Sequence, residues 1–590
     1  MADTPERRRA FLSNGLTSAV ELDGSIDWFP CPRFDSPSLF NRILDEKTGG
    51  HFSIRPEKAF TLETSYLPNT LILKSKFTTA DGNLTLTDFM PLGVPSIIRM
   101  FDSEIPFVVE IAPNFDMAMT RPSIEERDSG YIFKNVKTSE SFEVRLSGTY
   151  ERLGRGRARF SPGSGHILSI YFRNFNYGLF SKKGFVYPYP KEALHLTTDY
   201  WESQVSSARS VSMYSEAYYR SISVILGLMY LPSGGLIAAP TSSLPEVIGK
   251  GRNWDYRYVW IRDASYAIEA LTNAGLHTKA ARALSFLISV VDPSSKSFDH
   301  PLFQIDGTAP PPEEELGWLD GYKASKPVRT GNAAYQQIQM DCEGAFMDAF
   351  YQYVLKSKDV NYLRENMWAV RSIVKWTIGA WRLDGTSLWE EREANHHFVH
   401  SKVMSWVAMD RAAKMAHMLG HTEEANAWQA EAHLIRDDVM SNGISRKFGG
   451  FSKYYGAESV DSALLLLPLY GFVDANDPVF TATLKKVETD LLLKSGLLIR
   501  YESDSMGRVM NPFSLLNTWL SRVYTMRGEF GKASRALDVM ISYSTDLLLF
   551  SEHVDSETRE PLGNFPQLFP HAGLVEALLE YEDAVKAKKD

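Results

Sequence analysis

Two adjacent carboxylates, Glu390 and Glu391, follow Trp389 and precede an arginine in the segment 387–392, Ser-Leu-Trp-Glu-Glu-Arg. Like charges at close range raise the pKa of one partner, so the two groups cannot both ionise freely. A carboxyl group that keeps its proton near neutral pH can protonate a leaving oxygen, as the acid of a glycosidase does. A solvated surface run would have the same composition, and this segment alone leaves both interpretations open.

A second polar cluster is rich in aromatic residues and covers 253–263, Asn-Trp-Asp-Tyr-Arg-Tyr-Val-Trp-Ile-Arg-Asp. Arg262 and Asp263 can hold several hydroxyls of one sugar, while Tyr256 or Trp260 covers its apolar face. An isolated aspartate just before an apolar helical segment could instead cap that helix, so capping is the alternative for Asp263.

A third candidate, Glu552, lies between the apolar run 547–550 and the turn-rich segment 561–566. A carboxylate held on a rigid loop just after a helix is well placed to orient a water molecule. Taken alone the residue would be an ordinary loop glutamate, so its role depends on the groups that it faces.

Other residues with metal-binding or redox chemistry do not form a convincing site. His396 and His400 have the i, i+4 spacing of zinc ligands on a helix, but no glutamate or third ligand completes a known pattern. Cys31 and Cys342 lie far apart and are interpreted as buried thiols. We therefore expect neither a metal nor another cofactor.

The composition, with 44% hydrophobic and 23% charged residues, indicates a packed globular protein. A net charge of −9 with interspersed Lys and Arg provides no basic stripe, so we expect no nucleic acid or membrane partner. No apolar run reaches the roughly 20 residues of a membrane span, and none resembles a signal peptide, so we expect a cytoplasmic protein. The oligomeric state stays open, and a homo-oligomer is one alternative.

These candidate residues must be positioned by more than one domain, because 590 residues exceed a single hydrophobic core. Short alternating runs separated by turn signals extend to about residue 199. Asp23-Gly24, between two such runs, is a strong hairpin signal, and the segments 71–78 and 84–89 repeat the arrangement. We predict an antiparallel β-sandwich over residues 1–199, followed by a helical linker over 200–245 that includes a helix near 215–229.

The remainder, 246–590, shows helical periodicity. Helices are predicted near 262–275, 277–291, 332–355, 359–382, 401–419, 422–440, 459–470, 477–494, 513–527, 530–546 and 571–587. Close to twelve consecutive helices favour an (α/α)₆ barrel of paired inner and outer helices. A helical solenoid would give a similar count, but the chain has no sequence repeat of fixed period.

Taken together, these segments resemble glycoside hydrolase family 15, the family of glucoamylases and related prokaryotic trehalases. The resemblance spans nearly the whole chain and rests on the segments 23–28, 32–37, 254–263, 327–333, 388–390, 400–404, 551–552 and 563–567. It implies an N-terminal β-sandwich, a helical linker and an (α/α)₆ barrel with the active site in a pocket at one end.

The resemblance also implies residue roles. It makes Glu390, in Leu-Trp-Glu, the general acid and Glu552 the general base. It implies that Arg262 and Asp263 hold the nonreducing-end glucose, that Tyr256 lies beside the reacting ring and that Glu391 contacts the leaving sugar. Taken with the aromatic residues of the motifs and their neighbours, the predicted substrate-binding residues are Tyr256, Trp260, Arg262, Asp263, Trp389, Glu391 and Arg500.

The activity implied is hydrolysis of an α-glucoside from its chain end with inversion, releasing β-D-glucose. An inverting enzyme separates its two carboxyl groups by about 6.5–9.5 Å to leave space for water. Sequence reasoning places a glucoamylase acting on maltooligosaccharides or starch ends first and a trehalase second. A glycoside phosphorylase, which needs no base at Glu552, and a noncatalytic carbohydrate-binding protein are remote alternatives.

Overall fold

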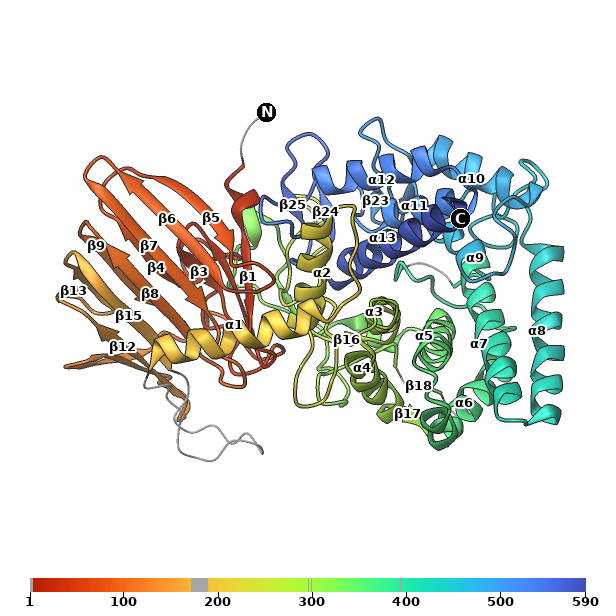
Figure 1. Ribbon diagram of the computed structural model, residues 1–590, viewed down its shortest axis with the longest axis horizontal. Helices are drawn as coiled ribbons and strands as arrows, with labels where there is room; N and C mark the ends of the chain where they lie inside the picture. Colours follow the sequence, from red (N-terminus) through yellow and green to blue (C-terminus); the bar gives the residue numbers. More distant parts are fainter. Residues whose placement is uncertain (1–3, 171–188, 295–296, 299, 393–394, 590) are drawn as a thin grey trace.

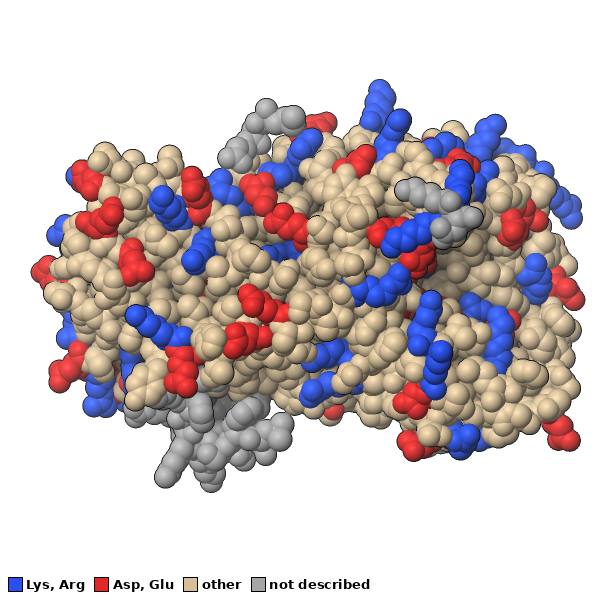
Figure 2. All heavy atoms as spheres, in the orientation of Figure 1, with Lys and Arg blue, Asp and Glu red and all other residues tan. Residues whose placement is uncertain are grey.

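The structure is a computed structural model and describes residues 4–170, 189–294, 297–298, 300–392 and 395–589. An N-terminal β-domain lies beside a larger helical domain, and helix α1 (Pro190–Ser206) runs from the first toward the second (Figure 1). Lys and Arg are interspersed with Asp and Glu over the face shown in Figure 2. No helix in the described part of the chain is long and apolar enough to cross a membrane.

Two antiparallel sheets form the β-domain, as predicted. The first has the order β1 (Ala10–Ser13), β2 (Ser18–Leu22), β3 (Ser25–Trp28), β4 (His51–Pro56), β9 (Phe107–Ala112), β14 (Arg157–Phe160) and β13 (Tyr150–Gly154). The second has the order β10 (Ser123–Arg127), β11 (Gly130–Lys134), β12 (Ser141–Ser147), β15 (Gly163–Ile170), β8 (Ile97–Ser103), β7 (Gly82–Phe89), β6 (Leu73–Thr79) and β5 (Thr61–Tyr66).

Local sequence explains the predicted hairpins. Asp23 and Gly24 both have positive φ, 51° and 79°, as the tight turn between β2 and β3 requires. Between the sheets, Phe101 of β8 packs against Phe107 of β9, with ring centroids 4.9 Å apart. Such aromatic contacts fill the sandwich core.

The helical domain is a closed ring of inner helices with a second, outer layer. In the described residues the inner helices are α3 (Ile261–Asn273), α5 (Asp341–Ser357), α7 (Val399–Met418), α9 (Leu466–Leu469), α11 (Leu516–Met526) and α13 (Leu568–Lys589). Each contacts the next, and α13 returns to α3. The outer layer contains α2 (Ser215–Gly227), α4 (His277–Ser289), α6 (Val360–Ala380), α8 (Thr422–Asn442), α10 (Pro478–Leu491) and α12 (Phe530–Ser542). This is the predicted (α/α)₆ architecture.

Burial separates the two layers. Nearly every described side chain of α3 and α11 is buried, whereas α4 and α12 bury one face only. An inner helix is covered on all sides by neighbours, while an outer helix such as α4 or α12 keeps a polar face toward solvent. Helix α2 is an exception in the outer layer, since nearly all of its residues after Glu216 are buried.

Helix α2, predicted to join the two domains, packs along α13 in the outer layer and also contacts the β-domain, where the Gly227 carbonyl accepts a hydrogen bond from the Ser13 hydroxyl at 2.6 Å. Two other predicted elements differ from the observed ones. Helix α1 begins at Pro190, inside the range predicted for the sandwich. The helix predicted from residue 332 begins only at Asp341, because the Asn332 side chain accepts a hydrogen bond from the Ala334 N–H and starts a short 3₁₀ turn, η3 (Ala333–Gln336), instead.

Short strand pairs and 3₁₀ turns complete the described elements. The strands are β16 (Val259–Trp260) with β19 (Leu302–Phe303), β17 (Val291–Asp292) with β18 (Ser297–Phe298), β20 (Glu314–Glu315) with β21 (Arg329–Thr330), β22 (Ser503–Asp504) with β23 (Gly507–Arg508), and β24 (His553–Val554) with β25 (Pro561–Leu562). The other turns are η1 (Pro5–Arg8), η2 (Tyr322–Ala324) and η4 (Ser462–Leu465), which leads into α9. Several of these loops carry the candidate site.

Candidate active site

A pocket of about 410 Å³, part of it open to solvent, brings the three sequence clusters together. Its walls are formed by Ala238, Tyr256, Trp260, Arg262, Asp263, Leu388, Trp389, Glu390, Arg500, Phe513, Glu552, Gln567 and Phe569. Every predicted site residue except Glu391 lines it. The fold therefore assembles in one place residues that are separated by up to several hundred positions in the chain.

Glu390 is held by three nitrogen donors that all reach its Oε1 atom. The Trp260 indole donates at 2.7 Å, the Gln339 amide at 3.1 Å and the Arg262 guanidinium at 3.3 Å. The residue also has a positive φ of 58°, which a non-glycine residue adopts only where its surroundings impose it. The carboxyl group is thus fixed through Oε1, and none of these contacts involves Oε2.

Glu552 is held by a different set of contacts. The Tyr256 hydroxyl donates to its Oε1 at 2.8 Å. A Cβ atom added at Gly563, whose φ is +69°, would lie 2.6 Å from Oε2 of Glu552, so only glycine fits there. Burial raises the pKa of Glu552, the charge of Glu246 raises it further, and Arg500 opposes both effects.

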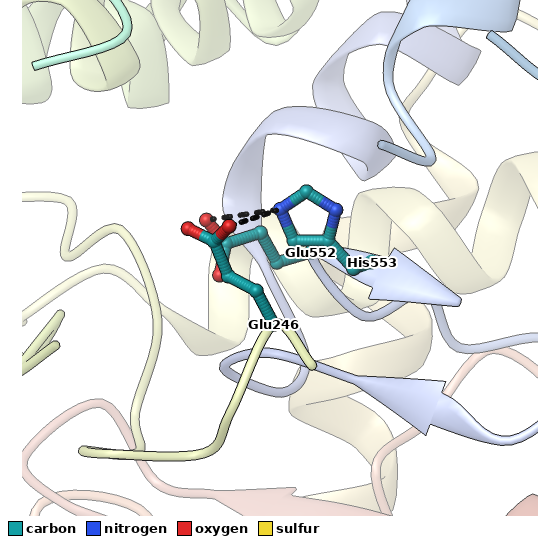
Figure 3. Close-up of side chains that lie close together, drawn as sticks. All are labelled: Glu246, Glu552 and His553. Carbon is teal, nitrogen blue, oxygen red and sulfur yellow. Dashed lines mark ion pairs between the residues drawn. The ribbon is translucent and has the colours of Figure 1, made fainter. Parts of the chain in front are cut away.

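His553 and Glu246 lie next to Glu552, and ligand atoms of the three side chains approach within 4.8 Å of one another (Figure 3). The Nε2 atom of His553 is 3.7 Å from Glu246 and 3.8 Å from Glu552. Two carboxylates and an imidazole are donors that a divalent cation accepts. The Arg500 guanidinium is already paired with Glu246, however, and places a positive charge where such a cation would bind.

Arg262 and Asp263 form the deep polar wall of the pocket. Arg262 donates to Gln339 at 2.9 Å and to Asp341 at 3.1 Å, and its Nε lies 3.6 Å from Asp263. Helix α3 begins at Ile261 with Trp260 at its N-cap, so Asp263 lies in the first turn and the capping alternative is wrong. Burial raises the pKa of Asp263 to about 7, Glu390 adds to the shift and Arg262 opposes it.

Several buried polar atoms of the pocket wall have no hydrogen-bond partner among the described protein residues. They are Arg262 Nε, Asp263 Oδ2, Arg500 Nε and Gln567 Oε1. Buried polar groups in folded proteins normally find a partner. Donors and acceptors that line one pocket in this way match the hydroxyl groups of a sugar ring.

Aromatic side chains provide the apolar part of the pocket. Tyr256 meets Trp260 edge to face with 5.4 Å between ring centroids. Trp389 packs against Phe513 and donates from its indole nitrogen to Asp461 at 3.0 Å. A rigid aromatic surface beside polar groups is typical of a carbohydrate site, since one face of a hexose is apolar.

Comparisons with known proteins agree with this chemistry. Residues 212–579 match the profile described as Glycosyl hydrolases family 15, and residues 2–149 match one described as Trehalase-like, N-terminal. The chain belongs to glycoside hydrolase family 15. Trehalase 2 of Sulfolobus acidocaldarius is 49% identical to this family 15 hydrolase over 574 residues, which cover 97% of the chain and 99% of that protein.

More distant relatives extend along the same length. A trehalase of Mycobacterium tuberculosis is 31% identical over 97% of this family 15 chain and 88% of its own. A bacterial glucoamylase complexed with acarbose superposes with a TM-score of 0.75 at 15% identity and covers 100% of this chain and 96% of its own. The second likeness concerns the fold, and it agrees with a β-domain followed by an (α/α)₆ barrel.

A second pocket of the family 15 hydrolase, of about 480 Å³, adjoins the first and shares Tyr256, Trp389, Glu390 and Arg500 with it. Its other walls are mainly polar; they are formed by Glu246, Arg252, Trp254, Asn332, Ala334, Gln337, Glu391, Arg392, Asp504 and Met506. The predicted leaving-sugar residue Glu391 lies here, where it pairs with Lys453.

Sequence reasoning missed several wall residues of the family 15 site. Gln339 holds Glu390, and Glu246 lies beside Glu552, yet neither belongs to the segments that carried the family resemblance. Phe513 and Phe569 have the composition of ordinary core residues. Gln567 stood within the segment 563–567 but was given no role, because nothing local shows which way its side chain points.

Proposed function

We propose that this family 15 enzyme hydrolyses α,α-trehalose to two glucose molecules with inversion at one anomeric carbon. The observation that carries the proposal is the pair of separately held carboxyl groups, Glu390 and Glu552, in one pocket lined by unpaired polar atoms. Relatives named trehalase that align over nearly the full chain support the choice of substrate.

In the proposed mechanism, Glu390 protonates the oxygen that joins the two sugars as the bond from that oxygen to C1 breaks. Glu552 removes a proton from a water molecule that attacks C1 from the opposite face. No metal or cofactor is needed, since both proton transfers are carried by protein carboxyl groups. The separation of the two groups of about 6.5–9.5 Å stays a prediction.

Substrate binding is divided between the two adjoining pockets. We assign the reacting glucose to the first pocket, where Arg262, Asp263 and Arg500 offer hydrogen bonds and Tyr256 and Trp260 offer an apolar face. We assign the leaving glucose to the second.

Polarity of the second pocket supports trehalose over long glucans. The Arg252–Asp504 ion pair and the Glu391–Lys453 ion pair put fixed charges along its wall. Trp254 is covered by two guanidinium groups, Arg329 at 4.3 Å and Arg392 at 4.0 Å from its ring centroid. A small polar compartment of this kind suits a single hexose with all hydroxyls bound. The sequence alone favours a glucoamylase, whereas the relatives and this compartment favour the trehalase alternative.

Glucose release from trehalose, maltose, maltotriose, isomaltose and starch tests the proposal. We expect kcat/KM for trehalose to exceed that for every other substrate by at least about 100-fold, which corresponds to roughly 2.7 kcal/mol of transition-state discrimination. The Glu390→Gln variant, assayed in parallel, identifies glucose released by contaminating enzymes. A higher kcat/KM for maltotriose or starch would reverse the assignment in favour of a glucoamylase.

A further inference from the structure

Three groups that can each accept a proton meet at the base side of the pocket. The carboxylates of Glu246 and Glu552 and the imidazole of His553 converge, and all three side chains are buried (Figure 3). Glu246 comes from the loop after α2, whereas Glu552 ends the loop that enters β24 and His553 is the first residue of that strand. Two distant parts of the chain therefore create this cluster.

Backbone contacts determine which nitrogen of His553 faces the carboxylates. Its Nδ1 atom lies 3.1 Å from the Pro512 carbonyl oxygen, which can only accept a hydrogen bond, so Nδ1 carries the hydrogen. Burial lowers the pKa of His553 to about 4, with Glu246 opposing the shift and Arg500 adding to it. The neutral ring then directs the Nε2 lone pair at Glu246 and Glu552, and no described protein atom donates to it.

The loop that carries Glu246 is attached directly to the segment around Glu552. The Gly563 N–H donates to the Pro245 carbonyl at 2.8 Å, and the Asn511 side chain donates to the Glu246 carbonyl, also at 2.8 Å. Arg500 bonds the Glu246 carboxylate, and Arg252 lies near it. These contacts keep a negative charge at a constant place beside the base.

From this geometry we propose that Glu246 and His553 are positioning residues that make Glu552 a stronger base. An ionised Glu246 opposes ionisation of Glu552, and the Nε2 lone pair of His553, 3.8 Å from Oε1 of Glu552, disfavours a second negative charge there. Both effects increase the proton affinity of Glu552. A base of higher proton affinity withdraws a proton from water more effectively, which is what the attacking water requires.

The charges around Glu246 keep it ionised, as its proposed effect on Glu552 requires. Burial opposes ionisation of Glu246, but the positive charges of Arg500 and Arg252 favour the carboxylate, and the pKa of Glu246 lies below its ordinary value. The charge of Glu246 is therefore retained, and it acts on Glu552. Tyr256 donates to Glu552 and Arg500 attracts it, so both partly offset this effect.

The inference rests on the proposed role of Glu552, and the test uses α-D-glucosyl fluoride. Fluoride leaves without a second sugar, so neither the leaving-sugar pocket nor a preference for trehalose affects the result. The pH dependence of kcat/KM is measured for wild type, Glu246→Gln and His553→Asn. Asparagine at 553 can still donate to the Pro512 carbonyl but has no group equivalent to Nε2.

We expect the acid limb of the profile to move to lower pH by about two units in Glu246→Gln, because a unit charge near 5 Å has roughly this effect at an effective dielectric constant of about 20. His553→Asn should move the limb in the same direction by a smaller amount. The plateau rate should fall in both variants, since the base is weaker.

Glu576→Gln serves as the matched control. Glu576 is a buried carboxylate of α13 that accepts from Asn273 at 3.0 Å and lies outside both pockets described above. Its substitution should leave the acid limb in place. An unchanged or raised limb in Glu246→Gln and His553→Asn would overturn the inference, as would an equal shift in Glu576→Gln. Retained activity in Glu552→Gln, measured in the same series, would instead overturn the proposed role of the base.

Discussion

The Trp260 indole donates a hydrogen bond of 2.7 Å to Oε1 of Glu390, and the same side chain packs edge to face against Tyr256. Tyr256 in turn donates to Glu552 at 2.8 Å. One aromatic pair therefore contacts both candidate catalytic carboxyl groups. Because indole and phenol rings have few rotatable bonds, this pair holds the two groups at a constant separation across the pocket.

Replacement of either carboxyl group by an amide should abolish most activity. We expect Glu390→Gln and Glu552→Gln each to lower kcat by about 100- to 10,000-fold, because each removes one proton transfer. Initial rates on trehalose, with circular dichroism to verify folding, provide the measurement. A folded variant that keeps more than about half of the wild-type rate would show that its residue has a different role.

Asp263→Asn should impair catalysis without destabilising the fold. The Oδ2 atom of Asp263 lies 3.6 Å from Arg262 Nε but accepts no hydrogen bond from the described protein residues, so a hydroxyl of the substrate is its expected ligand. Losing a charge-assisted hydrogen bond costs about 1.5–3 kcal/mol, equivalent to a roughly 10- to 150-fold lower kcat/KM. Steady-state kinetics and thermal unfolding of the same preparation check both halves of the prediction. Unchanged kinetics would remove Asp263 from the binding site.

Stereochemistry of the first products tests the mechanism directly. Attack by water at one anomeric carbon of α,α-trehalose inverts that centre only, so the first products should be β-glucose and α-glucose in equal amounts. A covalent intermediate on Glu552 would retain the configuration and give α-glucose alone. Proton NMR of the anomeric region, recorded before mutarotation mixes the products, distinguishes the two. Early α-glucose without the β-anomer would contradict an inverting mechanism.

Stability should fall as pH rises, because buried carboxyl groups hold protons in the folded state. Burial raises the pKa of Glu343 to about 8, well above the roughly 4.3 of an unfolded chain. Between these values the folded protein binds a proton that the unfolded chain releases. The stabilisation is therefore complete below the lower value and is lost as pH rises through the higher one, at up to about 1.4 kcal/mol per pH unit for one group.

The Glu343→Gln variant isolates this contribution. An amide cannot ionise, so the free energy of unfolding of the variant, measured by urea titration, should decline less steeply with pH than that of wild type. The comparison covers roughly pH 5 to pH 8, the range between the two pKa values given above. Its Ser297 contact at 2.9 Å can be kept by the amide oxygen. Parallel pH dependences for the two proteins would show that Glu343 is ionised in the folded state.

Local sequence determined the order of elements and the chemistry available to them. Asp23-Gly24 predicts its hairpin because the tight turn needs two residues with positive φ, and both have it. Helical periodicity predicted most helices to within a few residues, because apolar residues recur at helical spacing along the face that packs against the neighbouring layer. The residues from Tyr256 to Asp263 were likewise recognisable because they stand in a dense polar and aromatic segment, whereas Glu552 and Arg500 received their roles only from the family resemblance.

Tertiary structure alone decided which of these groups meet and in what state. The sequence contains no sign that Glu246 lies beside Glu552, or that Gln339 holds Glu390, because loop conformations depend on contacts between residues far apart in the chain. Composition and spacing did not distinguish Glu391, in the second pocket, from its neighbour Glu390, shared by both; only the family resemblance gave the two residues different roles. Protonation states also depend on tertiary structure, because burial and neighbouring charges set each pKa, and both arise only when the chain has folded.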